Sequence, residues 1–410
     1  MPARPPTTPL DVIVAGAGPA GLACAVRLRR RAPERRVLVI DRARFPRPKA
    51  CGGALTGHVG EALLTLGLTR RVPAATLARG EIRFGRYRRE VRLKRPIAVI
   101  RRLELDADLL EQARATGVEV HEGEALTRFA VGGGAVEVET SAGRYEARVL
   151  VGADGAGSLV RRQVHAPRVA PLCLFQGQVA AAPGADVLTF DFTPMRAGLR
   201  GYLWVFPTPG GGANVGLMHH PLTGNVEARL RLASGALGGR RLHALLGEGL
   251  RERALTLTGP LVGWPAWAYD PESPVAAPHL LLCGDAAGID PLSGEGIAVG
   301  LWQGILAADT ALAGLATGDL GFAGYRQAMR AATVGRELNV DRRIAEMIYG
   351  PAGMTRWLPL LLFDDDMVEL YAARVAGLQV LADAKATLVR ALSRHVLRLP
   401  QRRRRLAREC

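Results

Sequence analysis

The sequence predicts an α/β protein with three parts: a discontinuous domain built on a parallel sheet, an antiparallel β-sheet domain and a C-terminal helical region. Three observations predict this fold class. A strand, a glycine-rich turn, a helix and a second strand follow one another within residues 11–41. Residues 171–270 alternate apolar and polar positions between Gly and Pro turns, as antiparallel strands do. Residues 280–283 return to the continuous apolar composition of a parallel strand, so the second domain interrupts the first.

Three glycines organise the turn between the first predicted strand, residues 12–15, and the helix at residues 22–30. Gly16, Gly18 and Gly21 have the G-x-G-x-x-G spacing of a dinucleotide-binding βαβ unit. The first glycine permits the tight turn, the second lets the backbone approach a pyrophosphate, and the third lets the helix pack closely on the strand. Because the helix N-terminus adds free N–H groups and a positive dipole, we predict a pyrophosphate site at this turn.

The second strand, residues 37–40, ends on an acid at the distance that this motif requires. Asp41 can accept hydrogen bonds from a ribose with a free 2′-OH, which favours FAD or NAD over NADP. Arg42 follows directly and keeps NADP open, since an arginine suits a 2′-phosphate. The predicted cofactor site therefore includes Ala20 and Arg42 beside the three glycines and Asp41.

The length and composition are those of a globular protein with about two or three domains. The 410 residues are 48% hydrophobic and 22% charged, and the net charge of +16 is carried almost wholly by arginine. Arginine-rich codon usage and attraction to anionic substrates or membrane surfaces both account for this charge. Since no nucleic-acid-binding motif accompanies it, we expect no nucleic-acid partner.

Cysteine spacing predicts neither a metal site nor a disulfide framework. The five cysteines are widely scattered and no pair has C-x-x-C spacing, as expected in a reducing cytoplasm. Residues 1–9 are Pro-rich and lack the apolar core of a signal peptide. Because we find no apolar run of ~18 residues, we expect no transmembrane helix. The predicted location is cytoplasmic, with peripheral contact to a membrane as an additional expectation.

Several connecting stretches can be assigned in order. Residues 42–55 form a Pro- and Gly-rich loop, and helices are expected at 57–68 and 226–246. Residues 79–93 alternate apolar and charged positions, which predicts a solvent-faced antiparallel hairpin. We expect the basic tail, residues 401–410, to be frayed and solvated. The predicted domains are residues 10–165 with the hairpin inserted near 79–100, residues 166–275, residues 276–320, which complete the first domain, and residues 321–410.

Two further motifs accompany the first. Asp154 and Gly155 follow a predicted strand, and Ser158 and Arg161 open a turn of helix after them. In order and spacing, all three motifs resemble those of FAD-dependent oxidoreductases of the para-hydroxybenzoate hydroxylase fold, which implies a Rossmann-like FAD-binding domain. The third motif contains Gly284, Asp285, Pro291, Gly294, Gly296 and Ile297.

This resemblance implies how the later motifs contact the cofactor. Asp285, at a strand end, would hold a ribityl hydroxyl. The glycines and the helix start after Pro291 would present N–H groups to the pyrimidine edge of the flavin, where reduction places negative charge. Arg102, four residues before Asp106, matches the family pattern and would lie over the cofactor.

Finer features resemble the geranylgeranyl reductase family within this fold. Residues 46–53 look like its P-x-x-K-x-C-G-G segment, residues 202–207 look like its Y-x-W-x-F-P segment, and residues 284–297 look like its version of the third motif. The resemblance covers about residues 10–315. It implies hydride delivery from reduced FAD to a carbon–carbon double bond of an isoprenoid or other apolar small molecule, with NAD(P)H or ferredoxin as the reductant.

The family resemblance places catalysis at Cys51 and Tyr202. Cys51 would donate the proton that completes the reduction, or only pack on the flavin together with Gly52 and Gly53. Tyr202 and Trp204 share one face of a strand and, with Phe206, would line an apolar substrate pocket, although core packing also explains them.

An FAD-dependent monooxygenase or halogenase acting on an aromatic or polyketide-like product is the alternative function. Halogenases carry W-x-W-x-I-P, which Tyr202 and Phe206 break, and a catalytic lysine. The lysines of this chain, Lys49, Lys94 and Lys385, lie in no matching motif. Thr208 also departs from the reductase pattern, which leaves the substrate open.

The C-terminal region carries no recognisable motif, but two stretches suggest membrane contact. Residues 357–363 are an apolar run that would enter a bilayer face or form a buried turn. The basic run Arg402–Arg405 would favour an anionic surface.

Overall fold

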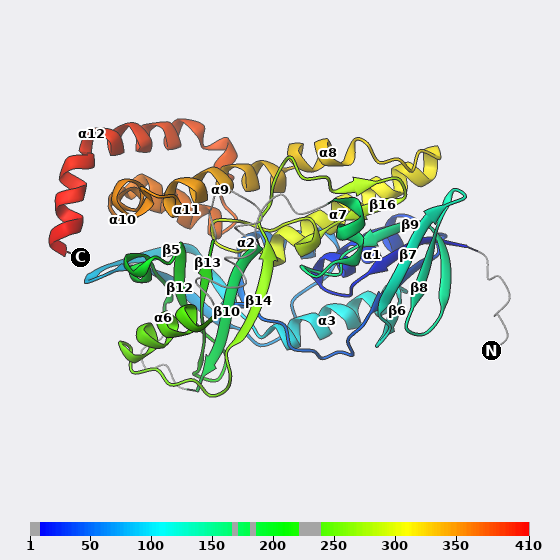
Figure 1. Ribbon diagram of the computed structural model, residues 1–410, viewed down its shortest axis with the longest axis horizontal. Helices are drawn as coiled ribbons and strands as arrows, with labels where there is room; N and C mark the ends of the chain where they lie inside the picture. Colours follow the sequence, from blue (N-terminus) through cyan, green and yellow to red (C-terminus); the bar gives the residue numbers. More distant parts are fainter. Residues whose placement is uncertain (1–8, 166–170, 181–185, 221–238, 410) are drawn as a thin grey trace.

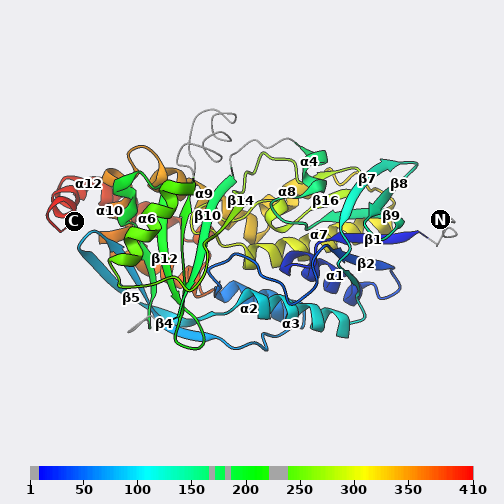
Figure 2. The same cartoon turned by 60° about the horizontal axis from the view of Figure 1, so that its bottom comes forward.

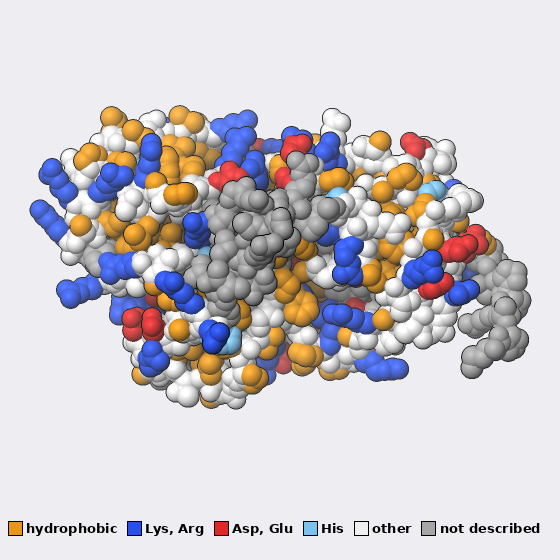
Figure 3. Space-filling model, viewed as in Figure 1, with side chains coloured by type: hydrophobic (Ala, Val, Ile, Leu, Met, Phe, Trp, Pro, Cys, Tyr) orange, Lys and Arg blue, Asp and Glu red, His pale blue; other side chains and the backbone are white. Residues whose placement is uncertain are grey.

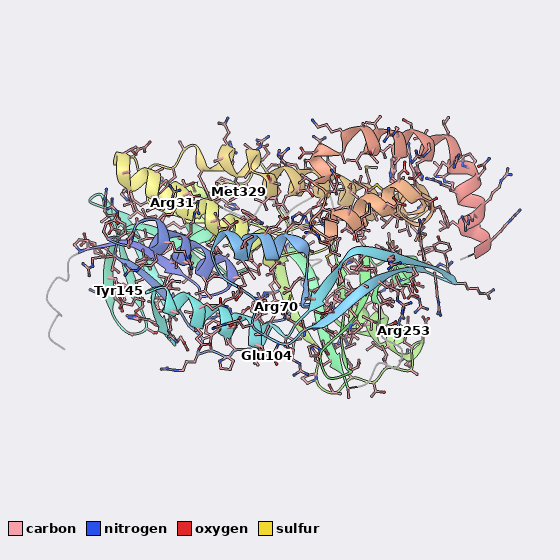
Figure 4. All side chains as sticks on the ribbon, turned by 180° about the vertical axis from the view of Figure 1, so that it is seen from behind. Arg31, Arg70, Glu104, Tyr145, Arg253 and Met329 are labelled. Atoms are coloured by element: carbon pink, nitrogen blue, oxygen red, sulfur yellow. The ribbon has the colours of Figure 1, made fainter. Side chains whose placement is uncertain are left out.

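The computed structural model describes residues 9–165, 171–180, 186–220 and 239–409. The stretch 1–8 and most of the helix expected at 226–246 lie outside these ranges. Two sheets lie along the long axis of the molecule, and the C-terminal helices lie over the second sheet (Figure 1). Seen from behind, Tyr145 beside the first sheet and Arg253 beside the second lie on opposite sides of the molecule (Figure 4). The predicted α/β fold class is confirmed.

The first sheet has a parallel centre with the order β16-β9-β1-β2-β6. Its central strands β1 and β2 are apolar on both faces, and residues 12–14 of β1 are fully buried. The antiparallel strands β7 and β8 extend the sheet from β9, and β15 pairs antiparallel with β16. The bounds are β1 (Leu10–Ala15), β2 (Val37–Asp41), β6 (Glu119–Glu122), β7 (Leu126–Gly132), β8 (Ala135–Thr140), β9 (Arg144–Gly152), β15 (Ala276–Ala277) and β16 (Leu280–Leu282).

Two helices pack tightly together beside this sheet. A Cβ on Gly304 of α7 would lie 2.2 Å from the carbonyl oxygen of Ala20 in α1, so the glycine permits the close contact. Helix α7 is long and apolar enough to cross a membrane, but 67% of its apolar 18-residue stretch is buried inside the protein. We interpret it as a core helix. The helices of this part are α1 (Pro19–Arg31), α2 (Gly57–Thr65), α3 (Arg102–Ala115), α4 (Leu159–Val164), η2 (Gly284–Ala286) and α7 (Ile297–Thr317).

The second sheet has the order β14-β10-β13-β12-β11-β4-β5-β3, and its only parallel pair among the described strands is β11 with β4. Along its buried centre, every residue of β12 and β13 is inaccessible to solvent or nearly so. The bounds are β3 (Ala54–Leu55), β4 (Ala75–Phe84), β5 (Tyr87–Val99), β10 (Pro171–Val179), β11 (Leu188–Asp191), η1 (Thr193–Ala197), β12 (Gly201–Pro207), β13 (Ala213–His219), α6 (Gly239–Arg251) and β14 (Val262–Trp267).

The hairpin expected near 79–100 differs from the prediction. Its strands β4 and β5 are longer than residues 79–93, and they extend the second sheet through β11 (Figure 2). The hairpin is not simply solvent-faced, because the Tyr87 hydroxyl donates to the carbonyl of Leu362 at 2.9 Å and its ring packs edge-on against Phe363. Alternation shows that one face is buried but does not show which partner buries it.

The C-terminal region is helical, and its tail corrects a prediction. Residues 401–409 continue α12 rather than fraying. The side chains at 401, 403–405, 407 and 408 are exposed as predicted, but Arg402 is only 6% exposed. Its guanidinium donates to the Asp364 carboxylate at 2.7 Å. Of the apolar run 357–363, Leu358 and Leu362 are fully buried, so this run packs as a turn of the core. The elements are α8 (Tyr325–Ala331), α9 (Thr333–Tyr349), η3 (Gly353–Trp357), α10 (Leu358–Phe363), α11 (Asp365–Val375), η4 (Leu381–Asp383) and α12 (Lys385–Glu409).

Candidate functional site

A cavity of about 850 Å³ brings together the loops at the carboxyl ends of β1, β2, β9 and β16, the strands β10 and β12, and helix α11. Ligands bind at these strand ends in open α/β sheets. Of the residues predicted from the sequence, Gly21 and Pro291 lie outside its lining. The predicted residues that line it are Gly16, Gly18, Ala20, Asp41, Arg42, Cys51, Gly52, Gly53, Arg102, Asp154, Gly155, Tyr202, Trp204, Phe206, Gly284, Asp285, Gly294, Gly296 and Ile297.

The glycine-rich turn has the geometry that its spacing predicts. Gly16 has a φ of 109°, and a Cβ there would lie 2.3 Å from the carbonyl oxygen of Ala153. A Cβ on Gly21 would lie 1.8 Å from the carbonyl oxygen of Gly16, so this glycine serves helix–strand packing rather than the cavity wall. Around Gly18 the space is open, since the nearest atom to a Cβ would be Arg47 Nη2 at 3.6 Å. The turn therefore leaves room for a ligand at Gly18.

Two acids lie beside this turn. Asp41 Oδ2 accepts a hydrogen bond from Ala17 N–H at 2.7 Å, and Oδ1 accepts one from Ala43 N–H at 2.8 Å. Asp154 Oδ2 accepts from Leu159 N–H at 2.7 Å, while its Oδ1 is buried without a partner among the described residues. Burial raises the pKa of Asp154, against the hydrogen bonds it accepts. An orphaned carboxylate oxygen in the cavity wall is suited to a ligand hydroxyl.

The cationic side chains near the glycine turn come from a loop and from α3. Arg102 donates to both oxygens of Asp106, at 2.8 and 2.9 Å, and Arg47 lies 3.4 Å from the same carboxylate. Although burial opposes its charge, Asp106 and the Cys51 thiol raise the pKa of Arg102. Arg102 therefore stays charged beside the thiol predicted to be catalytic.

The third motif forms the far end of the cavity. Asp285 pairs with Lys49 Nζ at 3.2 Å, and the ammonium lies 4.1 Å from the centroid of the Trp264 ring. Asp290 closes the following turn, because its carboxylate accepts from Leu292 N–H at 2.7 Å and from Ser293 N–H at 3.1 Å. This turn delivers the chain to Gly294, Gly296 and the start of α7. Gly294, Gly296 and Ile297 line the cavity, and that their N–H groups contact the pyrimidine edge of a flavin stays a prediction.

The peptide at Cys51 is held from both sides by side chains of the second sheet. Its N–H donates to Gln176 Oε1 on β10, and its carbonyl accepts from Asn214 Nδ2 on β13 at 2.9 Å. Asn214 Oδ1 accepts in turn from Trp204 Nε1 at 2.7 Å. A Cβ on Gly52 would lie 3.0 Å from the Phe206 ring, so the loop lies directly on the aromatic residues. The thiol position is therefore set by the sheet.

The aromatic residues of β12 are both core residues and cavity walls. Tyr202, Trp204 and Phe206 are each at most 6% exposed and contact one another and Phe190 on β11. The Tyr202 hydroxyl donates to the carbonyl of Ser293 at 2.5 Å, and burial raises the pKa of this phenol. Tyr202 therefore remains neutral, with its proton committed to the backbone, which favours Cys51 as the more available acid.

Several cavity residues were missed by sequence reasoning. Gln176 acts through a contact to the Cys51 backbone that only strand register reveals. Tyr371 and Arg374 come from α11, in the region that carries no motif. For these two, neither spacing nor composition offered a signal. Tertiary packing alone brings α11 to the cavity.

The residues present fit FAD. The open space at Gly18, the orphaned Asp154 oxygen and the glycines that line the cavity before α7 suit the pyrophosphate, hydroxyl and pyrimidine groups of that cofactor. Bound FAD supplies hydride-transfer chemistry. In the described part of the chain, no group of three or more His, Cys, Asp or Glu side chains is arranged to hold a metal ion.

Relatives support this assignment. Residues 9–182 match the FAD binding domain family. The chain is 32% identical over 387 residues to a menaquinone reductase of Mycobacterium tuberculosis, covering 85% of each chain. It is 29% identical over 329 residues to a geranylgeranyl diphosphate reductase of Rhodobacter capsulatus, covering 75% of this chain and 76% of that one.

Solved structures agree on the fold. A geranylgeranyl bacteriochlorophyll reductase-like protein of Thermoplasma acidophilum has a TM-score of 0.73 and 18% identity, covering 96% of this chain and 98% of that one. Flavin-dependent halogenases share the fold as well. The sequence relatives separate the two, because those named here are reductases. The chain belongs to the geranylgeranyl reductase family of FAD-dependent oxidoreductases.

Proposed function

We propose that this protein reduces a carbon–carbon double bond in the isoprenoid chain of a quinone of the menaquinone type. The observation that carries the proposal is the junction of Cys51 with an apolar wall, formed by Tyr202, Trp204 and Phe206 on β12. An apolar wall suits a polyprenyl chain, and a thiol suits proton delivery to an alkene carbon. The names of the mycobacterial and Rhodobacter relatives support an isoprenoid substrate.

In this proposal the protein chain positions the Cys51 thiol next to the alkene and supplies a proton from it. Gln176 and Asn214 hold the Cys51 peptide, and the aromatic wall excludes water from the alkene. Arg102, charged and adjacent, stabilises the thiolate that remains after Cys51 has given its proton to the second alkene carbon. The hydride for the first carbon is the contribution of the reduced cofactor.

The test is anaerobic reduction of the purified flavoprotein followed by exposure to a panel of menaquinones, polyprenyl lipids and aromatic compounds. The proposal expects flavin reoxidation by a menaquinone and a product heavier by two hydrogens in its isoprenoid chain. Reduction confined to the quinone ring, or reoxidation only by aromatic compounds in the presence of oxygen, would contradict it. The same preparation, reduced in parallel with NADH, NADPH and reduced ferredoxin, identifies the electron donor by rate.

Lysine positions argue against the halogenase alternative. Lys94 on β5 and Lys385 at the start of α12 are exposed and do not line the cavity. Lys49 lines it, but its ammonium is paired with Asp285 and lies over Trp264. No lysine of the chain is therefore free at the apolar end of the cavity, where a halogenation catalyst is required. A chlorinated or hydroxylated product from the substrate panel would restore this alternative.

A membrane contact also belongs to the proposal, and its location follows α12. Three apolar side chains of this helix are exposed: Val389 by 61%, Val396 by 58% and Leu397 by 81%. Apolar and basic side chains intermingle on this part of the surface (Figure 3). Residues 385–408 contain no acid. An apolar strip flanked by arginines suits the interface of an anionic bilayer.

Co-sedimentation with vesicles tests the contact. The full chain is mixed with anionic vesicles at low and high salt, and with neutral vesicles as the lipid control. Binding to anionic vesicles that weakens at high salt is expected, and Val396→Asp with Leu397→Asp should release the protein. Leu64→Asp, an equally exposed leucine on α2, is the matched control and should leave binding unchanged. Equal recovery of the unaltered chain in every supernatant would remove the membrane from the proposal.

A further inference from the structure

A buried cluster of charges joins the C-terminal helices to the cavity. Arg374 on α11 is 3% exposed and lines the cavity. Its Nε lies 3.1 Å from Glu337 Oε2, and its Nη2 pairs with Asp341, both on α9. On its other side, Arg374 faces Glu295 at 3.7 Å and Asp290 at 4.0 Å, in the turn before α7. One guanidinium therefore joins α9 to the turn before α7, which lines the cavity.

Tyrosines hold the same turn. Tyr349 at the end of α9 donates its hydroxyl to the carbonyl of Leu292 at 2.7 Å. Tyr202 on β12 donates to the carbonyl of Ser293, the next residue. Since carbonyls at the centre of the turn are bonded from α9 and β12, the turn has little freedom to move relative to the charges behind it.

The cluster has an excess of acid. Four carboxylates surround one guanidinium, which would leave three uncompensated negative charges in a buried site if all were ionised. Asp290 is compensated by the N–H groups of Leu292 and Ser293, and Glu337 accepts from Ala382 N–H at 2.9 Å. In the described part of the chain, Asp341 accepts no hydrogen bond from a backbone N–H group, and it is 0% exposed.

The two carboxyl oxygens of Asp341 have different surroundings. Asp341 Oδ2 is paired with Arg374, but Oδ1 is buried without a hydrogen-bond partner in the described ranges of the chain. An ionised oxygen without a partner in this position costs far more free energy than a protonated one. Burial raises the pKa of Asp341 well above its ordinary value, against the lowering effect of Arg374, and Asp290, Glu337 and Glu295 raise it further.

We propose that Asp341 holds a proton in the folded protein at neutral pH, and that its ionisation lowers the reduction potential of a flavin bound at the turn before α7. The inference rests on the proposed site for the pyrimidine edge at Gly294–Ile297. Reduction brings two electrons from the reductant, and the proton on Asp341 comes from solvent. Because negative charge arises next to the cluster, the two charges repel, and flavin reduction and proton binding favour each other.

The charged and titratable groups that act on Asp341 come from three elements: Glu337 on α9, Arg374 and Tyr371 on α11, and Asp290 and Glu295 in the turn before α7. Tyr349 and Tyr202 lie one step further out, against Asp290 and Tyr371. Burial raises the pKa values of the three tyrosines, so they stay neutral over the accessible range. Arg374 stays charged, because the surrounding acids raise its pKa despite burial. Among the four carboxyls, Asp341 is the one with a buried oxygen that has no partner in the described part of the chain, so we assign the change of charge to it.

The first test uses the protein without added flavin and compares thermal stability across pH for the wild type and Asp341→Asn. If folding raises the pKa of a carboxyl, the group stabilises the folded protein fully at pH values below its pKa in the unfolded chain. This contribution is lost as the pH rises through its pKa in the folded protein. The stability of the wild type relative to Asp341→Asn should therefore decrease as the pH rises from about 4, the pKa of an Asp in the unfolded chain, to the pKa of Asp341 in the folded protein. Glu369→Gln, an exposed neighbour on α11, should follow the wild type. Parallel curves for the wild type and Asp341→Asn would overturn the proposal.

The second test measures the midpoint potential of bound FAD against pH. The potentials of the wild type and Asp341→Asn should coincide at low pH and separate at high pH, where the wild type ionises and its potential becomes lower. Asp341→Ser is a second neutral variant, and failure of both variants to fold would show that the negative charge is required, which also overturns the proposal. If the wild type binds FAD but reduces no alkene, the proposed function is wrong. Both pH experiments would still test the role of Asp341, because neither depends on the substrate.

Discussion

Replacement of Cys51 by alanine tests the proton donor directly. The change removes one thiol from the cavity wall while the peptide stays held by Gln176 and Asn214, because both contacts are to the backbone. Arg102 keeps its two hydrogen bonds to Asp106, so its position does not depend on the thiol. The variant should therefore bind FAD and accept electrons as the wild type does.

The expected loss lies in the substrate half-reaction. A positioned general acid contributes roughly 10²–10⁴-fold to the rate, or about 3–5 kcal/mol of transition-state stabilisation. Cys51→Ala should slow flavin reoxidation by substrate by a factor in this range, and Cys51→Ser should be slow as well. Asn214→Leu removes a contact to the Cys51 carbonyl and leaves the thiol in place, so its cost should be smaller, about tenfold.

The assay is stopped-flow absorbance of the flavin under anaerobic conditions, with reduction and reoxidation recorded separately. Cys173→Ala, a second half-buried cysteine outside the cavity lining, is the matched control and should reoxidise at the wild-type rate. Reoxidation of Cys51→Ala at the wild-type rate would refute the reasoning and leave Cys51 a packing residue, with water or Tyr202 as the proton source. A slower reduction phase would instead show that the thiol supports cofactor placement.

The remaining predictions concern cofactor binding and the C-terminal helices. Gly18→Val should abolish FAD binding, because its side chain fills the open space at the glycine turn; an unchanged flavin absorbance after purification would reassign the site. Arg402→Met should lower the free energy of unfolding in urea by roughly 3 kcal/mol, since it leaves Asp364, 2% exposed, with Arg394 as its remaining cation; a loss below ~1 kcal/mol would mean that α12 is weakly docked. Although burial opposes it, the hydrogen bonds from Arg402 and Arg394 lower the pKa of Asp364, so its contribution is present above about pH 4 and is lost as pH falls through the folded value. In Arg402→Met the melting temperature should therefore fall less steeply as the pH is lowered. A pH dependence identical to that of the wild type would count against the ion pair between Arg402 and Asp364.

The local motifs were readable from the sequence because their chemistry is contained in a few consecutive residues. The steric demand at Gly21 is met within one strand–turn–helix unit, because a Cβ there would lie 1.8 Å from the carbonyl oxygen of Gly16. The demand at Gly16 is set by the chain after β9, since a Cβ there would lie 2.3 Å from the carbonyl oxygen of Ala153, but the motif spacing already identifies this glycine. The carboxylate of Asp41 reaches the backbone of the same turn. Periodicity likewise indicated the two sheets, since alternating and continuous apolar runs report burial on one face or on both.

Tertiary structure decided what alternation and composition leave undetermined, namely which element covers which. The hairpin of β4 and β5 joined the second sheet because β11 offered a free edge, and no residue in the hairpin specifies that partner. The basic tail became the end of α12 because Asp364, 38 residues away, buries Arg402 as its counter-charge. Arg374 reaches the cavity for the same reason: long-range charge pairing is a property of the packed chain, and a sequence lists the charges without their distances.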